Sequence, residues 1–244
     1  MNDVARNLAQ VYERMAQAAL RVGRDPAEVT LVAVTKTFPP EAAIAAYDAG
    51  VRHFGENRVE EALPKIPAVH AYLAGPRPTW HMVGHVQSRK AQPVVACFDT
   101  VDSVDRLRIA LRLSQFAHEA GRVLPVLLEC NVSGEETKFG FDLRDWGQDE
   151  ARRSVFFTEV GEILALPGLA VQGLMTMAPF VADAEVVRPV FASLRALLEL
   201  LRERFPMGDW RHLSMGMTDD FEVAIEEGAT LVRIGRAIFG LRPA

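Results

Sequence analysis

The stretch Leu31–Pro40, LVAVTKTFPP, is a short run of aliphatic and β-branched residues that ends on a lysine and two prolines. The apolar run predicts a buried strand over 30–35, which ends at the prolines because they lack the N–H that a sheet ladder requires. Lys36 then lies at the rim of the sheet. Taken alone, it is either a solvated charge that discourages edge pairing or, if partly desolvated, an amine that forms a Schiff base with an aldehyde.

Seven further strand candidates follow, separated by segments with helical periodicity. The full set is TLVAVT (30–35), VRHFG (51–55), WHMVG (80–84), CFDTV (97–101), LPVLLECNV (124–132), LAVQGLMTM (169–177), RHLSM (211–215) and TLVRIG (230–235). This alternation predicts an α/β fold, a (β/α)8 TIM barrel that uses residues 1–244 as a single domain with an extra N-terminal helix over about 2–20. An open doubly wound sheet remains the alternative, because periodicity alone does not close a barrel.

Three of the intervening helices have recognisable ends. PPEAAIAAYDAG begins with proline and ends at Gly50, SVDRLRIALRLSQFAHEAG begins on Ser103 as a cap and ends at Gly121, and TDDFEVAIEEG runs from Thr218 to Gly228. The polar segment 133–150 predicts a long loop after the fifth strand that covers the mouth of the barrel.

The composition restricts the class of protein. The chain has 244 residues, 49% of them hydrophobic, and a net charge of -5. That is ample for a large core, and the scattered basic residues form no stripe for nucleic acid. No apolar run is long enough for a membrane span, and the first residues do not resemble a signal peptide, so a cytoplasmic protein is expected. Cys97 and Cys130 lie in apolar runs and are expected to be buried free thiols.

In a barrel the carboxyl ends of the strands share one face, and the unusual residues of this chain gather there. LSMGMTDD and VRIGR each place a strand, a small residue and a helix start in succession, so backbone N–H groups and the Ser214 hydroxyl are exposed to an anion. Ordinary β-to-α turns are the alternative explanation. The loops after the seventh and eighth strands of such barrels commonly bind phosphate, so a phosphorylated ligand is expected.

Two other candidates have equally ordinary alternatives. Arg233 alternates with Val232 and Ile234, so it points into the barrel, either as part of a structural ion pair or as a donor to a ligand. His81 and His85 lie four apart, but no third ligand follows at a recognisable spacing, so no metal site is expected.

Several motifs together resemble the YggS/PROSC family of pyridoxal 5'-phosphate (PLP) homeostasis proteins. They are AVTKT, HFGENRVEEA, WHMVGHVQSRK, NVSGEETKFGF, GLMTM, LSMGMTDDFEVAI and VRIGRAIFG, in this order from about residue 30 to 240. The family is similar to the barrel domain of bacterial alanine racemases. The resemblance therefore implies a (β/α)8 barrel with PLP at its C-terminal mouth.

The resemblance also implies roles for individual residues. Lys36 would hold PLP as an internal aldimine, Arg233 would face the pyridine nitrogen, and Asn57 and Met175 would line the ring pocket. The phosphate would be held by Ser214, by the backbone around Met215 and Gly216, and by the N–H groups of Gly235 and Arg236. Arg236 departs from the small hydroxyl residue usual in related sequences. Lys138 matches a lysine that is a secondary PLP site in the family, although a solvated loop lysine is the simpler alternative.

The resemblance implies a PLP binder that buffers the cofactor or delivers it to apoenzymes, as a monomer, without turnover. An arginine at the pyridine nitrogen only donates, so the ring would be a weak electron sink. Racemisation also needs a second acid or base, and Tyr12, Tyr47 and Tyr72 all lie away from the predicted strand ends. A weak PLP-dependent enzyme of the racemase type remains the alternative.

Overall fold

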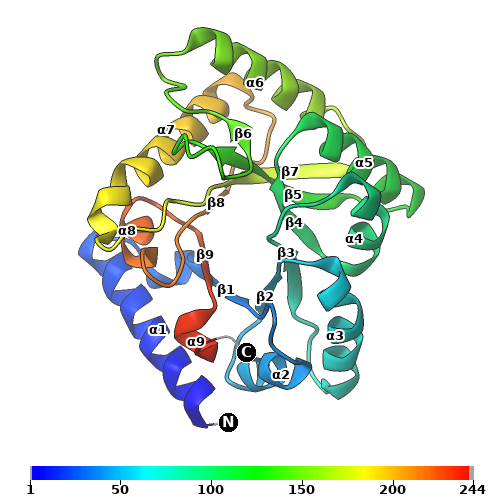
Figure 1. Cartoon of the computed structure of the whole chain (residues 1–244), viewed down its shortest axis with the longest axis vertical. Helices are drawn as coiled ribbons and strands as arrows, with labels where there is room; N and C mark the ends of the chain where they lie inside the picture. Colours follow the sequence, from blue (N-terminus) through cyan, green and yellow to red (C-terminus); the bar gives the residue numbers. More distant parts are fainter. Residues whose placement is uncertain (1, 242–244) are drawn as a thin grey trace.

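The chain folds into a closed barrel of parallel strands surrounded by helices (Figure 1). The structure is a computed structural model and describes residues 2–241. The barrel strands are β1 Thr30–Val34, β2 His53–Glu56, β3 Thr79–Met82, β4 Thr100–Val104, β5 Leu124–Asn131, β7 Leu169–Met175, β8 His212–Ser214 and β9 Leu231–Ile234. Their order is β4-β3-β2-β1-β9-β8-β7-β5, and β4 also pairs with β5. The predicted TIM barrel is therefore confirmed, and the open sheet is excluded.

Helices follow the strands around the outside of the barrel. They are α1 Asn2–Arg21, α2 Pro40–Asp48, α3 Val59–Tyr72, α4 Ala91–Cys97, α5 Leu107–Glu119, α6 Glu150–Leu164, α7 Arg188–Arg204, α8 Phe221–Glu226 and α9 Arg236–Phe239. Short 3-10 turns occupy η1 Pro26–Glu28, η2 Ser88–Lys90 and η3 Ala184–Val187. Within residues 2–241, none of these helices combines the length and the apolar character that crossing a membrane requires.

Successive side chains of each strand point alternately into the barrel and toward the surrounding helices, as expected for a barrel. Val32, Leu127, Met175 and Leu231 form a small cluster in the interior. Their neighbours along the strands belong to a much larger cluster, which lies between the strands and the helices and accounts for most of the buried apolar surface. The interior is thus narrow, and polar residues on the inward positions are held close together.

The predicted N-terminal helix is confirmed as α1, which lies against α8 and α9 on one flank of the barrel (Figure 1). Leu8, Val11 and Met15 are buried along its inner side. Arg14 pairs with Glu222 of α8 at 2.6 Å. The helix therefore closes the side of the barrel where the last strand and the first strand meet.

The fourth strand begins later than the sequence predicted. CFDTV was assigned to a strand over 97–101, but Cys97 ends α4 and β4 begins at Thr100. The apolar residues of AQPVVACF face the core in either conformation, so a short apolar run does not distinguish a helix from a strand. The two cysteines differ in burial. Cys97 is half-buried, and burial raises the pKa of its thiol to about 11, while Cys130 is fully buried. Both are free thiols, as expected.

Ser103 is not a helix cap. It lies inside β4, and its Oγ donates to the carbonyl of Gly84 at 2.7 Å, while α5 begins at Leu107 with Arg106 at the cap position. The serine therefore ties two neighbouring strand ends together. Its small polar side chain gave the same local signal that a cap would give.

The remaining boundaries differ by a few residues. The second strand runs over 53–56 and not 51–55, and α8 spans only Phe221–Glu226 of the predicted 218–228. The predicted loop over 133–150 contains a short strand, β6 Phe141–Asp142, which pairs with β5. Tyr72 is the last residue of α3.

Candidate active site at the barrel mouth

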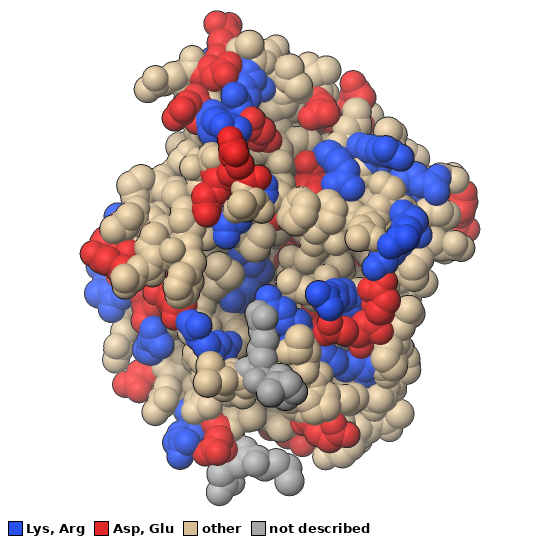
Figure 2. Space-filling model, viewed as in Figure 1, with Lys and Arg blue, Asp and Glu red and all other residues tan. Residues whose placement is uncertain are grey.

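A cavity of about 590 Å³ opens at the carboxyl ends of the barrel strands. It is lined by Val34, Lys36, Phe38, Asn57, Val83, Met177, Phe180, Met217, Thr218, Asp219, Arg233, Gly235, Arg236, Gly240 and Leu241. Figure 2 shows Lys and Arg side chains near the centre of one face of the molecule. The cavity therefore combines an apolar wall with a small number of cationic groups, as binding sites for small ligands commonly do.

Lys36 lies at the first turn after β1, on the side that faces the cavity. Val32 and Val34 point into the barrel, so the two-residue period places the lysine on the same face. The following residue, Thr37, has a φ of 66°, which is unusual for a β-branched residue. Such backbone conformations persist at binding and catalytic sites when surrounding contacts hold them.

Arg233 points into the barrel from β9, as predicted, and its guanidinium borders the cavity. One Nη donates to Ser214 Oγ at 2.7 Å and the other to the carbonyl of Thr176 at 2.8 Å. Burial lowers the pKa of this guanidinium, while the carboxylates of Asp102 and Glu129 act against that shift. Both hydrogen bonds go to uncharged oxygens, and Arg233 is also one of the residues that line the cavity.

The turn after β8 lies behind the cavity. Ser214 and Met215 are fully buried, and the Met215 N–H donates to the carbonyl of Leu231 at 3.1 Å. Gly216 has a φ of 91°, and a Cβ there would lie 2.6 Å from the Cβ of Ala224. The turn thus requires glycine, and the Met215 N–H and the Gly216 carbonyl are bonded to β9. The next residues of the chain, Met217 and Thr218, line the cavity.

The rim of the cavity carries an ion pair. Arg236 donates from Nη2 to Asp219 Oδ1 at 2.6 Å, and both side chains are about half exposed. Gly235 and Arg236 line the cavity, so the backbone at the start of α9 faces the same space. Sequence analysis anticipated Arg236 but not Asp219, which is an acidic helix-start residue of a very common kind.

Asn57 lines the cavity from the turn after β2. This turn is packed tightly against the turn after β3, since a Cβ on Gly84 would lie 2.3 Å from the Asn57 carbonyl oxygen. Met175, at the end of β7, is fully buried in the interior cluster beneath the cavity. Of the predicted site residues, the structure brings Lys36, Asn57, Arg233, Gly235 and Arg236 to the cavity wall. Met175 and the turn Ser214–Gly216 lie behind that wall.

Lys138 lies in the loop after β5, outside the cavity lining. Its Nζ is 3.8 Å from a Glu135 carboxylate oxygen. The neighbouring Phe139 stacks on His85, with ring centroids 3.9 Å apart. The loop thus reaches across to the turn after β3.

Inside the barrel, histidines and acids form hydrogen-bonded pairs. His81 Nδ1 lies 3.0 Å from Asp102 Oδ2, and His81 Nε2 lies 3.0 Å from His53 Nδ1. Burial lowers the pKa of His53 to about 4. At the mouth, His85 Nδ1 lies 2.7 Å from Asp105. Among residues 2–241, no group of three or more potential ligands is arranged to hold a metal ion.

Glu129 is a buried acid that sequence analysis missed. It lies near the end of β5 and is only 2% exposed. Burial raises the pKa of its carboxyl to about 7; Asp105 adds to the shift, and Arg233 opposes it. The signal in the sequence was an acid within the apolar run LPVLLECNV.

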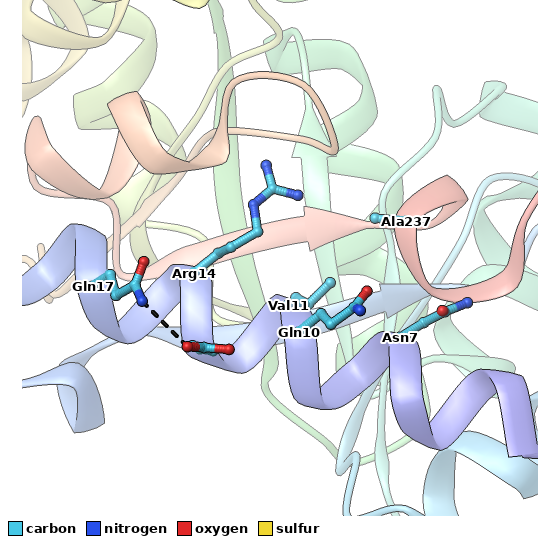
Figure 3. A pocket seen from close by; sticks show the side chains of 7 residues that line it. Asn7, Gln10, Val11, Arg14, Gln17 and Ala237 are labelled. Carbon is cyan, nitrogen blue, oxygen red and sulfur yellow. Dashed lines mark hydrogen bonds between the residues drawn. The ribbon is translucent and has the colours of Figure 1, made fainter.

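A second hollow lies between α1 and α9 (Figure 3). Its polar side chains are engaged within the chain: Asn7 donates to the carbonyl of Ile238, and Gln17 donates to Glu13. The Arg14 pairing with Glu222 described above borders the same hollow. We interpret it as the seam along which α1 docks, and not as a binding site.

Known proteins share this architecture over the whole chain. The family model for the alanine racemase N-terminal domain matches residues 6–243. The pyridoxal phosphate homeostasis protein of Escherichia coli (strain K12) is 42% identical over 246 residues, which cover 99% of this chain and 98% of that protein.

Solved structures agree with these sequence matches. PipY of Synechococcus elongatus PCC7942 with PLP bound superposes with a TM-score of 0.78 at 36% identity, covering 94% of this chain and 100% of PipY. The alanine racemase of Clostridium difficile 630 has a TM-score of 0.65 at 14% identity over 96% of this chain and 57% of that protein, which shows the fold alone. The chain belongs to the family of pyridoxal phosphate homeostasis proteins (YggS/PROSC), which has the alanine racemase N-terminal-domain fold.

Proposed function

We propose that this protein binds PLP in the cavity at the barrel mouth and keeps it covalently on Lys36. The observation that supports this most strongly is the presence of the Lys36 amine and the Arg233 guanidinium in the wall of one cavity. The volume of about 590 Å³ is within the range for small cofactors. When bound, PLP supplies an aldehyde for attachment to an amine and a ring that accepts electrons.

The residues around the cavity fit the two ends of such a ligand. At the ring end, Arg233 is fixed by Ser214 and Thr176, and as a guanidinium it donates and does not accept hydrogen bonds. Asn57, in the cavity wall, would border the ring, and Met175, buried in the interior cluster, would support that wall. A donor opposite the pyridine nitrogen keeps that nitrogen unprotonated, which weakens the ring as an electron sink.

At the phosphate end, we propose that the backbone of Gly235 and Arg236 and the Thr218 side chain bind the anion. These groups line the cavity. Ser214 Oγ accepts from Arg233 and the Met215 N–H donates to Leu231, so from the turn after β8 we propose the Ser214 O–H and the Gly216 N–H as further donors to the anion. The turn from Ser214 to Gly216 lies behind the phosphate end of the cavity and supports its wall. The Thr218 hydroxyl accepts from the Ala237 N–H at 3.4 Å and keeps its own O–H to donate, so it supplies the hydroxyl that Arg236 lacks.

Holding PLP for other proteins, without turnover, is the function that we propose. Supporting it, the curated relatives are homeostasis proteins by name, and Tyr12, Tyr47 and Tyr72 all lie on outer helices, away from the cavity. The alternative is a weak PLP-dependent enzyme acting on amino acids. One observation favours it: His85, oriented by Asp105 at 2.7 Å, is an acid–base candidate near the mouth.

Both parts of the proposal are tested on one preparation. Purified protein mixed with excess PLP and passed over a desalting column is expected to retain one PLP per chain. Incubated with L- or D-alanine in D₂O, this holoprotein is expected to produce neither the other enantiomer nor sustained Cα deuteration, with an authentic alanine racemase as the positive control. Failure to retain PLP would refute binding, and sustained racemisation that is lost in His85→Ala would establish the enzyme alternative.

We further propose that Lys138 is a secondary PLP site that relays the cofactor outward. Its support is the position in a loop that packs across to the turn after β3. Lys138→Ala holoprotein is therefore expected to activate a PLP-requiring apoenzyme several-fold more slowly than wild type, with total bound PLP unchanged. Equal transfer rates would eliminate the relay.

The remaining properties are the domain organisation, the oligomeric state, the partners and the cellular compartment. We propose that residues 1–244 act as one PLP-binding domain, as a monomer, and that its partners are PLP and, transiently, apoenzymes that need it. The free thiols of Cys97 and Cys130 fit a reducing cytoplasm, where disulfides are rare.

A further inference from the structure

A buried cluster of charged and polar groups lies directly beside the turn that presents Lys36. Lys65 Nζ, on α3, is 2.5 Å from Glu56 Oε1 and 2.7 Å from the carbonyl oxygen of Thr35. The same Glu56 oxygen accepts from Thr35 Oγ1 at 2.6 Å. Thr35, Glu56 and Lys65 are all less than 5% exposed. The residue that precedes Lys36 is thus held at both its carbonyl and its hydroxyl.

The residue that follows Lys36 is held from the same part of the chain. The Thr37 N–H donates to Glu61 Oε2 at 2.8 Å, and Glu61 lies on α3 four residues before Lys65. The Phe38 N–H donates to the carbonyl of Thr35 at 3.1 Å, which closes a four-residue turn with Lys36 at its first central position. The second central position is Thr37, whose φ of 66° costs free energy and requires outside support.

Stability alone is a poor explanation for this cluster. A buried ion pair often contributes no more than well-packed apolar residues of the same size, because both charges are desolvated. Glu56 Oε2 is buried without a partner among residues 2–241, which adds a further cost. Both donors converge instead on Oε1, the one oxygen that reaches Thr35.

We propose that Glu56 and Lys65, together with Glu61, are positioning residues that fix the Thr35–Phe38 turn and so hold the Lys36 amine where it meets the ligand aldehyde. Their side chains lie on the outer side of the strands, between β2 and α3, so they act through Thr35 and Thr37 and do not line the cavity. The inference rests on the proposed attachment of PLP to Lys36. It predicts that loosening the cluster impairs attachment more than binding.

The test compares Lys65→Met, the double variant Glu56→Gln/Lys65→Met, and Glu61→Ala with wild type. Lys65→Met leaves a buried carboxylate unpaired, whereas the double variant removes both charges, and Glu61 is partly exposed, so at least one variant is expected to fold. The matched control is Val69→Ala, which loosens the buried side of α3 and removes none of the cluster's hydrogen bonds.

Two quantities are measured. In ligand-free protein, amide hydrogen exchange at residues 37 and 38 is expected to accelerate in the cluster variants and to stay close to wild type in Val69→Ala. With PLP added, total bound PLP is compared with the rate at which borohydride-trappable PLP appears on Lys36. That rate is expected to fall on the order of 10- to 100-fold in the cluster variants, as expected for displacement of a reacting group by about 1 Å, while total binding changes less.

The outcomes distinguish a failure of PLP attachment to Lys36 from a failure of the positioning role. If wild type itself shows no trappable PLP, the proposed function fails, whatever the variants do. If wild type is trapped on Lys36 and the folded cluster variants show unchanged exchange and unchanged trapping rates, the positioning role is refuted. Equal slowing in Val69→Ala and the cluster variants would also refute it, because general loosening of α3 would then explain the effect.

Discussion

Lys36→Ala is expected to abolish the main covalent attachment of PLP, which we propose lies on Lys36. The amine lies in the cavity wall at the end of β1, and alanine cannot form a linkage to an aldehyde. In the visible absorption spectrum of protein mixed with PLP, the yellow band of the wild type should be absent from the variant. Its near-UV circular dichroism should match wild type, because the side chain is only half-buried.

Lys90→Ala is the matched control for this experiment. Lys90 ends η2, pairs with Glu60 and lies outside the cavity lining, so its removal should leave the yellow band intact. A variant lacking Lys36 that kept a full-strength band would show that another amine holds the cofactor. Loss of the band in Lys138→Ala would show that Lys138, and not Lys36, is the main attachment site.

Arg233→Met is expected to lower the free energy of unfolding by about 2–4 kcal/mol, because two buried oxygens lose their donors. The substitution removes the donors to Ser214 and Thr176 and leaves buried Asp102 and Glu129 without the cation that compensates them. Urea unfolding followed by circular dichroism measures the change, and the fraction of PLP retained should fall in parallel.

The control is Arg236→Met, three residues further along the chain. Its guanidinium is half exposed and pairs with Asp219 at the rim, so the loss of stability should be below about 1 kcal/mol. Equal stability losses for the two arginines would mean that the buried hydrogen bonds of Arg233 contribute little and that its inward position is not critical.

Much of the fold was predictable because local patterns agree with it. The β-branched runs, the glycines at helix ends and the amphipathic α1 each indicate their own element, and their alternation favours a barrel. Closure depends on the pairing of β4 with β5, which no local pattern shows. The start of β4 was not predictable, since AQPVVACF satisfies the core equally well as helix or strand.

The site residues that lie at or near the ends of strands were predictable from the sequence. Lys36 and Arg233 follow directly from the two-residue period of β1 and β9. The hydrogen bond from Arg233 to Ser214 depends on how β8 and β9 pair, which no local pattern shows. The pairing of Glu56 with Lys65 was equally hidden, because it joins a strand to a helix across the outer layer.

The most direct test of the account is to locate the attached cofactor. Wild-type protein is mixed with PLP, reduced with borohydride, digested and mapped by mass spectrometry. The account predicts that the main phosphopyridoxyl adduct lies on Lys36, with any lesser adduct on Lys138. An unmodified Lys36 in protein that retains PLP, or a main adduct on another lysine, would contradict it.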